Sequence, residues 1–383
     1  MRPEHELTVV LSRSPLSDSS ARRARSLITA IEDWDAFFAF AKAGWVEPVA
    51  FKNLNQIEAG AVPESVRDHA IEAATEARAT SLARTLLMNQ LLSGLSESGI
   101  SSIIIKGPAL GITAYGDPTL RSFGDIDLLI QRKDLGRARD HLLSSGFSRA
   151  YQELSERSLL DAGHALEFAR PNLKVELHGS LISKYLRIPF DEESLWSASR
   201  SVECAGREIQ VLAPHIQFVF ICAHGAKHEW LQLRLICDVA QLLDRMSDDD
   251  ADAVADVALS LNARRLVAIA VRTAEAVFES VNVPMPIQDL CRGQDVSRTV
   301  EDIRTRLQIS DDPGSPELPL LARIHPALPP LFFWMKARER LRDRVVAAAS
   351  LLLHAGSNED GKVLGMHPWR VAGRALHRMR SVR

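Results

Sequence analysis

The sequence IIIKGPALGITAYGDPTLRSFGDIDLLI, residues 103–130, contains the clearest structural pattern in the chain. It begins with three isoleucines, which are typical of a short buried strand. Pro108 stands where the first turn of a helix would begin, and the turn sequence at residues 116–118 predicts that this helix ends near Tyr115. DIDLLI, residues 125–130, then alternates acidic and aliphatic side chains and predicts a second strand. Two strands joined by a short helix indicate an α/β unit in the middle of the chain.

The residues that follow extend this unit. Asp134 is placed to begin a helix that runs to about Ser145 and ends at Gly146. Residues 166–169 and 173–178 predict a β-hairpin that turns at Pro171-Asn172. Residues 202–204 and 208–212 predict another, which turns at Ala205-Gly206. The α/β unit therefore extends over residues 100–212.

The flanking regions have helical periodicity. Residues 26–98 read as helices in which Leu82, Leu86, Leu91 and Leu95 form one apolar stripe, and Gly99 provides a stop. The first 25 or so residues are polar and rich in Ser and Arg, so we expect them to be loose. From Pro214 onward the period is helical, with proline-rich breaks at residues 284–286 and 326–330. We predict an α+β fold, in which a small mixed sheet at residues 100–212 lies between an N-terminal helical region, residues 1–99, and a C-terminal helical domain, residues 213–383.

Composition excludes several classes of protein. The net charge is −3, from 46 Lys and Arg against 49 Asp and Glu, so no overall basic field favours nucleic acid. None of the four cysteines forms a CxxC pair, which argues against a zinc ribbon and a disulfide scaffold. The N-terminus has no apolar run of signal-peptide length, and the longest apolar stretch near the C-terminus, residues 345–353, is too short to span a bilayer. We therefore expect a cytoplasmic protein.

Three acidic residues form a candidate metal site. Side chains two apart on a strand leave the same face roughly 6.6 Å apart, so Asp125 and Asp127 share a face while Ile126 and Leu128 point into a core. In LKVELHGS, residues 173–180, Glu176 lies on the polar face of its strand. Carboxylates gathered in this way repel one another unless a cation neutralises them, and Mg²⁺ suits this arrangement. The alternative is that the two aspartates are merely solvated on an edge strand, since DxD alone is a weak motif.

Several of these motifs together resemble a bacterial branch of the DNA polymerase β-like nucleotidyltransferase superfamily, usually called uncharacterised nucleotidyltransferases. The matching motifs are Lys106-Gly107, Arg121, the Asp-Ile-Asp at residues 125–127, the Val-Glu-Leu-His at residues 175–178, and His224 with His228 on a later helix. The similarity covers roughly residues 85–250. Each motif alone is weak, but the set is specific.

The resemblance implies an enzyme that transfers a nucleoside monophosphate from a nucleoside triphosphate to an acceptor and releases pyrophosphate. Asp125, Asp127 and Glu176 would then be the catalytic metal ligands for Mg²⁺ or Mn²⁺, with ATP as the expected nucleotide. Lys106, Gly107, Arg121 and His178 would contact the nucleotide. The acceptor would be a small molecule, a peptide or a protein rather than nucleic acid.

A catalytically degenerate binding or antitoxin-like module is the alternative function. The wider superfamily has Gly-Ser after the first strand, whereas this chain has Lys106-Gly107-Pro108, and proline offers no N–H to a phosphate. The presence of all three acids favours the enzyme.

Other polar residues have two interpretations each. Arg121 is either a phosphate ligand or an ion-pair partner of Asp125 or Asp117. His224 and His228 share a helix face, and Asp238 often accompanies them in the family. On one straight helix Asp238 would lie about 21 Å from His224, and WLQLRL contains no Gly or Pro to break it. We therefore favour a packing or substrate-facing role over a zinc site for these three residues.

Overall fold

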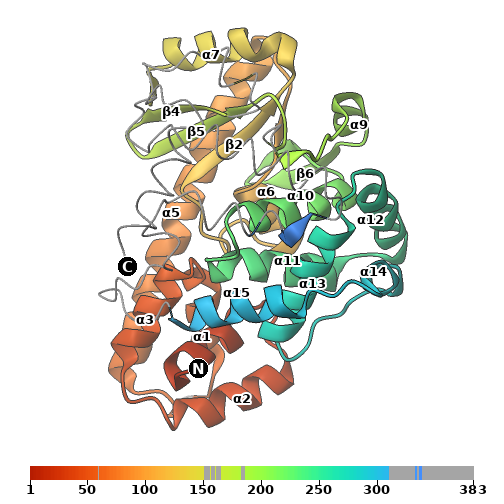
Figure 1. Ribbon diagram of the computed structural model, residues 1–383. Coiled ribbons are helices and arrows are strands. Elements are labelled where there is room, and N and C mark those ends of the chain that lie inside the picture. The colour runs from red at the N-terminus through yellow and green to blue at the C-terminus, as the bar shows by residue number, and fades with distance from the viewer. Residues whose placement is uncertain are drawn as a thin grey trace, which may run out of the picture.

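The computed structural model describes residues 1–58, 60–150, 156, 160, 165–182, 186–309, 333 and 336–338. Most of the segment after residue 309, including the expected break at residues 326–330, lies outside this part. The described chain has helices at both ends and a mixed sheet in the middle, as the sequence predicted (Figure 1). None of its helices is long and apolar enough to cross a membrane.

The N-terminal region is helical from its third residue. Its helices are α1 (Pro3–Leu11), α2 (Asp18–Ile28), α3 (Trp34–Ala43), α4 (Glu47–Gln56) and α5 (Glu64–Glu97). The expectation that the first 25 residues are loose was wrong, because Leu7 and Leu11 of α1 are fully buried and α1 packs against α3 and α4. With Val9, these residues give α1 three buried apolar side chains, which hold the helix in the core despite the polar residues around them.

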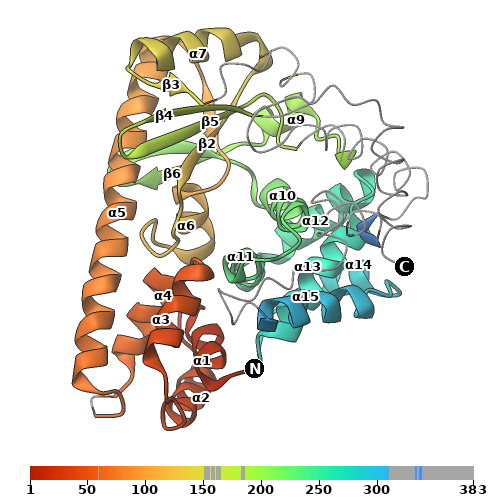
Figure 2. The same cartoon turned by 60° about the vertical axis from the view of Figure 1, so that its left-hand side comes forward.

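Helix α5 runs along one side of the whole molecule, from the N-terminal helices to the sheet (Figure 2). The leucine stripe predicted for it was wrong in its first half, because Leu82 and Leu86 are 42% and 48% exposed. The small residues Ser81 and Thr85 are buried instead, which lets the helix approach its neighbours closely. The helix stops at Gly99 as predicted, and this glycine has a positive φ of 66°.

The sheet has seven strands in the order β3-β4-β5-β2-β1-β7-β6. Its strands are β1 (Ser102–Ile104), β2 (Asp125–Ile130), β3 (Ser148–Arg149), β4 (Leu166–Arg170), β5 (Leu173–His178), β6 (Arg200–Cys204) and β7 (Arg207–Val211). The hairpins turn where the sequence predicted, with positive φ at Asn172, Ala205 and Gly206. Between strands lie α6 (Pro108–Tyr115), the 3₁₀ turn η1 (Arg132–Asp134), α7 (Leu135–Ser144) and α9 (Glu192–Ser197).

The two faces of the sheet belong to two apolar cores. Ile126, Leu128 and Ile130 of β2 pack in one core with the end of α5 and with α7. Leu129 packs in the other core, which joins the N-terminal and C-terminal helices. Because side chains alternate along a strand, the face of Leu129 is also the face of Asp125 and Asp127. The acidic face of the sheet is thus turned toward the C-terminal helices.

The C-terminal region is a helical layer. Its helices are α10 (Pro214–Lys227), α11 (Leu233–Arg245), α12 (Asp248–Ser260), α13 (Arg264–Val277), α14 (Met285–Cys291) and α15 (Ser297–Ile309). Arg234, in the first turn of α11, connects all three regions of the chain. Its guanidinium lies 4.7 Å from the ring centre of Trp45 and donates to the Ser122 carbonyl at 2.9 Å.

Candidate active site

The parallel pairing of β2 with β5 brings the predicted acids together. In this register Asp127 lies beside Glu176, and side chains at paired positions of a sheet leave the same face. Strand β1 runs antiparallel to β2 on its other side, so Lys106, just after β1, approaches Asp127. The acids of two strands and the lysine that follows a third strand therefore meet on one face of the sheet.

Asp127 is the centre of this group. Its Oδ1 lies 2.6 Å from Lys106 Nζ and 3.0 Å from His178 Nε2, and its side chain is 2% exposed. His178 Nε2 lies 3.1 Å from Glu176 Oε2, so one imidazole bridges two carboxylates. Among the described residues, Asp127, Glu176 and His178 form a group whose ligand atoms all lie within 4.8 Å of one another, which suits one metal ion.

The charges of these groups depend on one another. Burial alone would raise the pKa of Asp127, but Lys106 and His178 hold it well below its usual value. Burial likewise opposes the charge of Lys106, yet Asp127, Glu176 and Asp125 together raise the pKa of Lys106. Hydrogen bonds to Asp127 and Glu176 also raise the pKa of His178 against the effect of its burial. The site therefore holds ionised carboxylates, which it balances with its own cations.

Asp125 lies on the same strand face but outside the group that suits one metal. Burial and the Asp127 carboxylate raise the pKa of Asp125. The fold thus disfavours the charge on Asp125 and favours the charge on Asp127, although the two residues are only two positions apart on β2. An additional cation near Asp125 would remove this penalty.

The turn after β1 has the geometry that Gly107 was expected to provide. Gly107 has φ 58° and ψ −125°, a conformation that favours glycine, and it precedes α6, which has Pro108 at its first turn. A side chain at position 107 would lie 3.5 Å from the Asp125 carbonyl oxygen. The turn thus places the backbone at the start of α6 beside the first aspartate of β2.

Arg121 pairs with neither of the carboxylates expected for it. Its guanidinium binds Asp238 of α11 in a bidentate ion pair, with distances of 2.9 and 2.8 Å. The Tyr115 hydroxyl donates to the same carboxylate at 3.0 Å, and all three side chains are buried. The predicted partner, Asp125 or Asp117, was therefore wrong, because α11 brings Asp238 to the loop before β2.

The helix that contains His224 and His228 breaks where no break was expected. α10 ends at Lys227, and Glu229 and Trp230 adopt positive φ values of 53° and 59° before α11 begins. The Trp230 side chain is packed over Gly225, where an added Cβ would lie only 2.3 Å from its ring. Tertiary packing thus makes the corner that we expected only Gly or Pro to make. Asp238 is nevertheless held by Arg121, while the rings of His224 and His228 pack against each other at 4.6 Å.

Sequence reasoning missed the cations that accompany these histidines. Lys227 lies between them in the sequence, and the charges of Lys106, Glu176 and Asp127 all act on the pKa of Lys227. The side chains of Lys227 and His228 are exposed on one side, but the protein around them removes part of their hydration. This partial desolvation and the charge of Lys106 lower the pKa of both groups. The sequence contained this signal, because Lys227 directly precedes His228 in HGAKHEW, residues 224–230.

The pH dependence of stability should report on His228. Desolvation and Lys227 lower the pKa of His228 from its ordinary 6.5 to about 4. The unfolded chain therefore takes up this proton first, so stability present above pH 6.5 is lost as the pH falls toward 4. We expect the melting temperature of His228→Gln to fall less over this range than that of the wild type. If the melting temperatures of the wild type and of His228→Gln fell equally with pH, His228 would be freely solvated.

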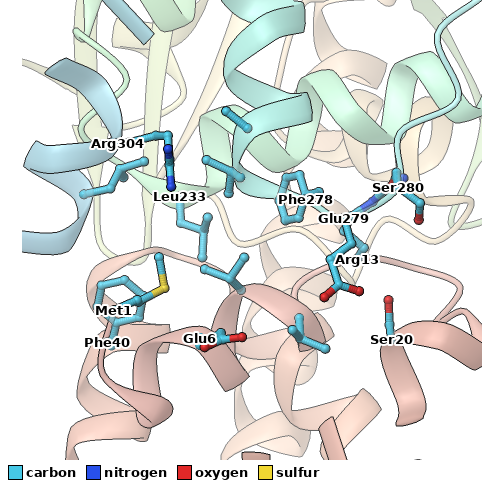
Figure 3. A pocket seen from close by; sticks show the side chains of 15 residues that line it. Met1, Glu6, Arg13, Ser20, Phe40, Leu233, Phe278, Glu279, Ser280 and Arg304 are labelled. Carbon is cyan, nitrogen blue, oxygen red and sulfur yellow. Dashed lines mark hydrogen bonds between the residues drawn. The ribbon is translucent and has the colours of Figure 1, made fainter. Parts of the chain in front are cut away.

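A separate cavity of about 280 Å³ lies between the N-terminal helices and α13 and α15 (Figure 3). Several of its charged residues are already paired. Glu6 binds Arg23, Arg13 binds Asp244, and Arg304 binds Glu301 at 3.1 Å. Its lining is otherwise largely apolar, so this cavity has none of the chemistry found at Asp127.

A mixed sheet with acids on two adjacent strands, preceded by a glycine turn, is the arrangement that the sequence resemblance led us to expect. A family model described as "uncharacterised nucleotidyltransferase" matches residues 31–279, which is more than half of the chain and includes the whole site. The chain therefore belongs to this nucleotidyltransferase family. No curated protein shows a significant match to it.

Proposed function

We propose that this protein is a metal-dependent nucleotidyltransferase. In this proposal it transfers a nucleoside monophosphate from a nucleoside triphosphate, with ATP as the expected one, to an acceptor hydroxyl or phosphate and releases pyrophosphate. The main supporting observation is the convergence of Asp127, Glu176 and His178 within 4.8 Å, with Asp125 on the same strand face. Family membership supports the same class of reaction.

The residues present fit a divalent cation. The carboxylates of β2 and β5 supply oxygen ligands, and the close contact of Lys106 with Asp127 shows that this position already attracts a positive charge. Mg²⁺ would be held by Asp125, Asp127 and Glu176, and the imidazole of His178 would suit Mn²⁺ as well. When bound, such an ion neutralises phosphate charge and lowers the pKa of an attacking hydroxyl.

The chain's own groups would position the reactants. Gly107 allows the backbone at the start of α6 to approach a phosphate, and Lys106 supplies a counter-charge. Glu176 is 26% exposed, which makes it the most accessible of the three converging side chains and the suitable acceptor for the proton of the attacking hydroxyl. Catalysis of this kind depends on position and charge more than on a covalent nucleophile.

The defining experiment is an assay of pyrophosphate release. The purified protein is given each of the four common nucleoside triphosphates with Mg²⁺ or Mn²⁺, and with pooled small-molecule, peptide and protein acceptors. Release that requires both a metal and an acceptor supports the proposal. Metal and nucleotide binding without release would favour the alternative, a catalytically degenerate binding module. The contact between Lys106 and Asp127 is the observation that favours this alternative, because it places a lysine where the enzyme needs a metal.

Replacement of Lys106 by Ala should have opposite effects on the two ligands. Loss of a charge-assisted phosphate contact should weaken binding of a non-hydrolysable triphosphate analogue by about 10- to 150-fold. Mg²⁺ alone should bind more tightly, because Asp127 loses the cation that competes with it. Calorimetric titration measures both affinities, with Lys133→Ala, an exposed lysine on η1, as the control. Unchanged analogue binding would exclude Lys106 from the triphosphate site.

A further inference from the structure

We propose that a cavity at the C-terminal ends of β2 and β5 binds the acceptor, and that the acceptor is a hydroxylated small molecule with a flat apolar group. The inference rests on the proposed function. It goes beyond that function because it names the place and the chemical class of the second substrate.

The cavity has the size and lining of a small-molecule site. Its volume is about 540 Å³, within the usual range for ligand pockets. Its walls combine apolar side chains with a polar rim. The apolar residues are Leu129, Leu181, Ile182, Ile188, Pro189, Phe190, Leu195 and Trp196, and the polar ones are Arg132, Ser180, Arg187, Glu192 and Asn262. Figures 1 and 2 both place α9, which contributes Leu195 and Trp196, next to the sheet on the side of α10 and α12.

The cavity continues the strand face that carries the acids. Leu129 follows Asp127 by two residues, so its side chain lies on the same face roughly 6.6 Å further along β2. On the neighbouring strand, Gly179 and Ser180 of the lining directly follow His178. The cavity therefore adjoins Asp127 and His178 along this strand face, and its own lining adds the polar side chains of Arg132, Ser180 and Asn262.

The direction of the reaction assigns this end to the acceptor. Because β1 is antiparallel to β2, Lys106 and Gly107 lie near the start of β2, beside Asp125, whereas the cavity lies beyond its other end. With the leaving pyrophosphate at Lys106 and Gly107, in-line displacement requires the attacking oxygen on the opposite side of the α-phosphorus. The acceptor oxygen bonds to this phosphorus while the bond to the bridging oxygen breaks. Pyrophosphate leaves with the electron pair, and the hydroxyl proton passes to Glu176.

One polar atom in the lining has no partner. Trp196 Nε1 is buried and meets no hydrogen-bond acceptor among the residues that the structure describes. A buried donor without a partner costs free energy, and a ligand oxygen would recover this cost once the indole turns its enclosed Nε1 toward the cavity. The expected acceptor thus combines a flat apolar group with an oxygen that accepts from Trp196.

Tyrosol, which has an aromatic ring, a phenol oxygen and an aliphatic hydroxyl, is a suitable probe, with glycerol as the ligand control. Binding is measured by saturation-transfer NMR on the full-length protein, first without nucleotide. Ser180→Trp fills the cavity, and Trp196→Phe removes the donor but keeps a ring. Ser144→Trp, on the exposed surface of α7, is the matched control. A triphosphate analogue with Mg²⁺ is titrated into each protein by calorimetry.

We expect tyrosol, but not glycerol, to bind the wild type and Ser144→Trp and to show no binding to Ser180→Trp. Trp196→Phe should bind it roughly 2- to 12-fold more weakly, as loss of one neutral hydrogen bond predicts. All four proteins should bind the analogue equally. Equal tyrosol binding by all variants, or none by the wild type, would overturn the inference. Loss of analogue binding in Ser180→Trp would assign the cavity to the nucleotide instead. A wild type that binds tyrosol here but no nucleotide would remove the proposed function and the acceptor assignment with it.

Discussion

Replacement of Asp127 by Asn should reduce metal-dependent turnover on the order of a thousandfold or more, the scale seen when an essential charge-stabilising group is lost. Asp127 contributes to the candidate metal group and contacts both Lys106 and His178. The amide keeps the shape of the side chain but carries no charge. Metal affinity, measured with Mn²⁺, should fall in parallel with turnover.

The structure changes what this substitution should do to stability. Clustered acids that repel one another would by themselves predict that removal of one costs little stability. Lys106 and His178 hold the pKa of Asp127 low, so the folded state favours this charge, and its removal should lower the free energy of unfolding by about 1–3 kcal/mol. Asp125→Asn is the matched control. The fold disfavours the Asp125 charge, so this variant should be as stable as the wild type or more stable.

Urea unfolding of the two metal-free variants tests the stability expectations, and turnover at saturating metal tests the site. Asp125→Asn should lose activity without losing stability. Full activity in Asp127→Asn would contradict the metal site. A fall in turnover that matched only the unfolded fraction would instead mean that Asp127 is structural.

Local sequence patterns predicted most of the sheet. DIDLLI predicted β2 with the bounds that the structure has, and the turns at Pro171-Asn172 and Ala205-Gly206 predicted two hairpins. These features depend on neighbours in the sequence, where alternation and turn residues are visible. The same alternation predicted that Glu176 lies on a polar face, and the β2–β5 register places it beside Asp127.

Features that depend on distant contacts were harder to predict. The corner at Glu229 and Trp230 contains no Gly or Pro, and it is held by Trp230 packed over Gly225 and by a 2.8 Å ion pair between Glu229 and Arg306. Neither contact is visible from spacing. The convergence of His178 with Asp127 and Glu176 required the pairing register of β2 with β5. The roles of these residues in catalysis remain predictions.

The buried pair of Arg121 and Asp238 should have the largest effect on stability. Their side chains are 4% and 1% exposed, and the pair joins the loop before β2 to α11. Removal of one partner leaves the other charge buried, which typically costs about 3–5 kcal/mol. We expect a loss of this size in Asp238→Asn and in Arg121→Met.

Two further variants separate the pair from a general effect of mutation, and urea unfolding measures all of them. The double variant Arg121→Met with Asp238→Leu should recover much of the loss, because no buried charge is left alone. Arg292→Ala breaks an exposed ion pair with Asp289 and should change the free energy of unfolding by less than about 1 kcal/mol.

The same proteins decide whether Arg121 also binds phosphate. If Arg121→Met weakens binding of the triphosphate analogue while Asp238→Asn does not, at a temperature where both are folded, the guanidinium has a second role. If both weaken it equally, the pair acts on the site only by holding α11 against the sheet.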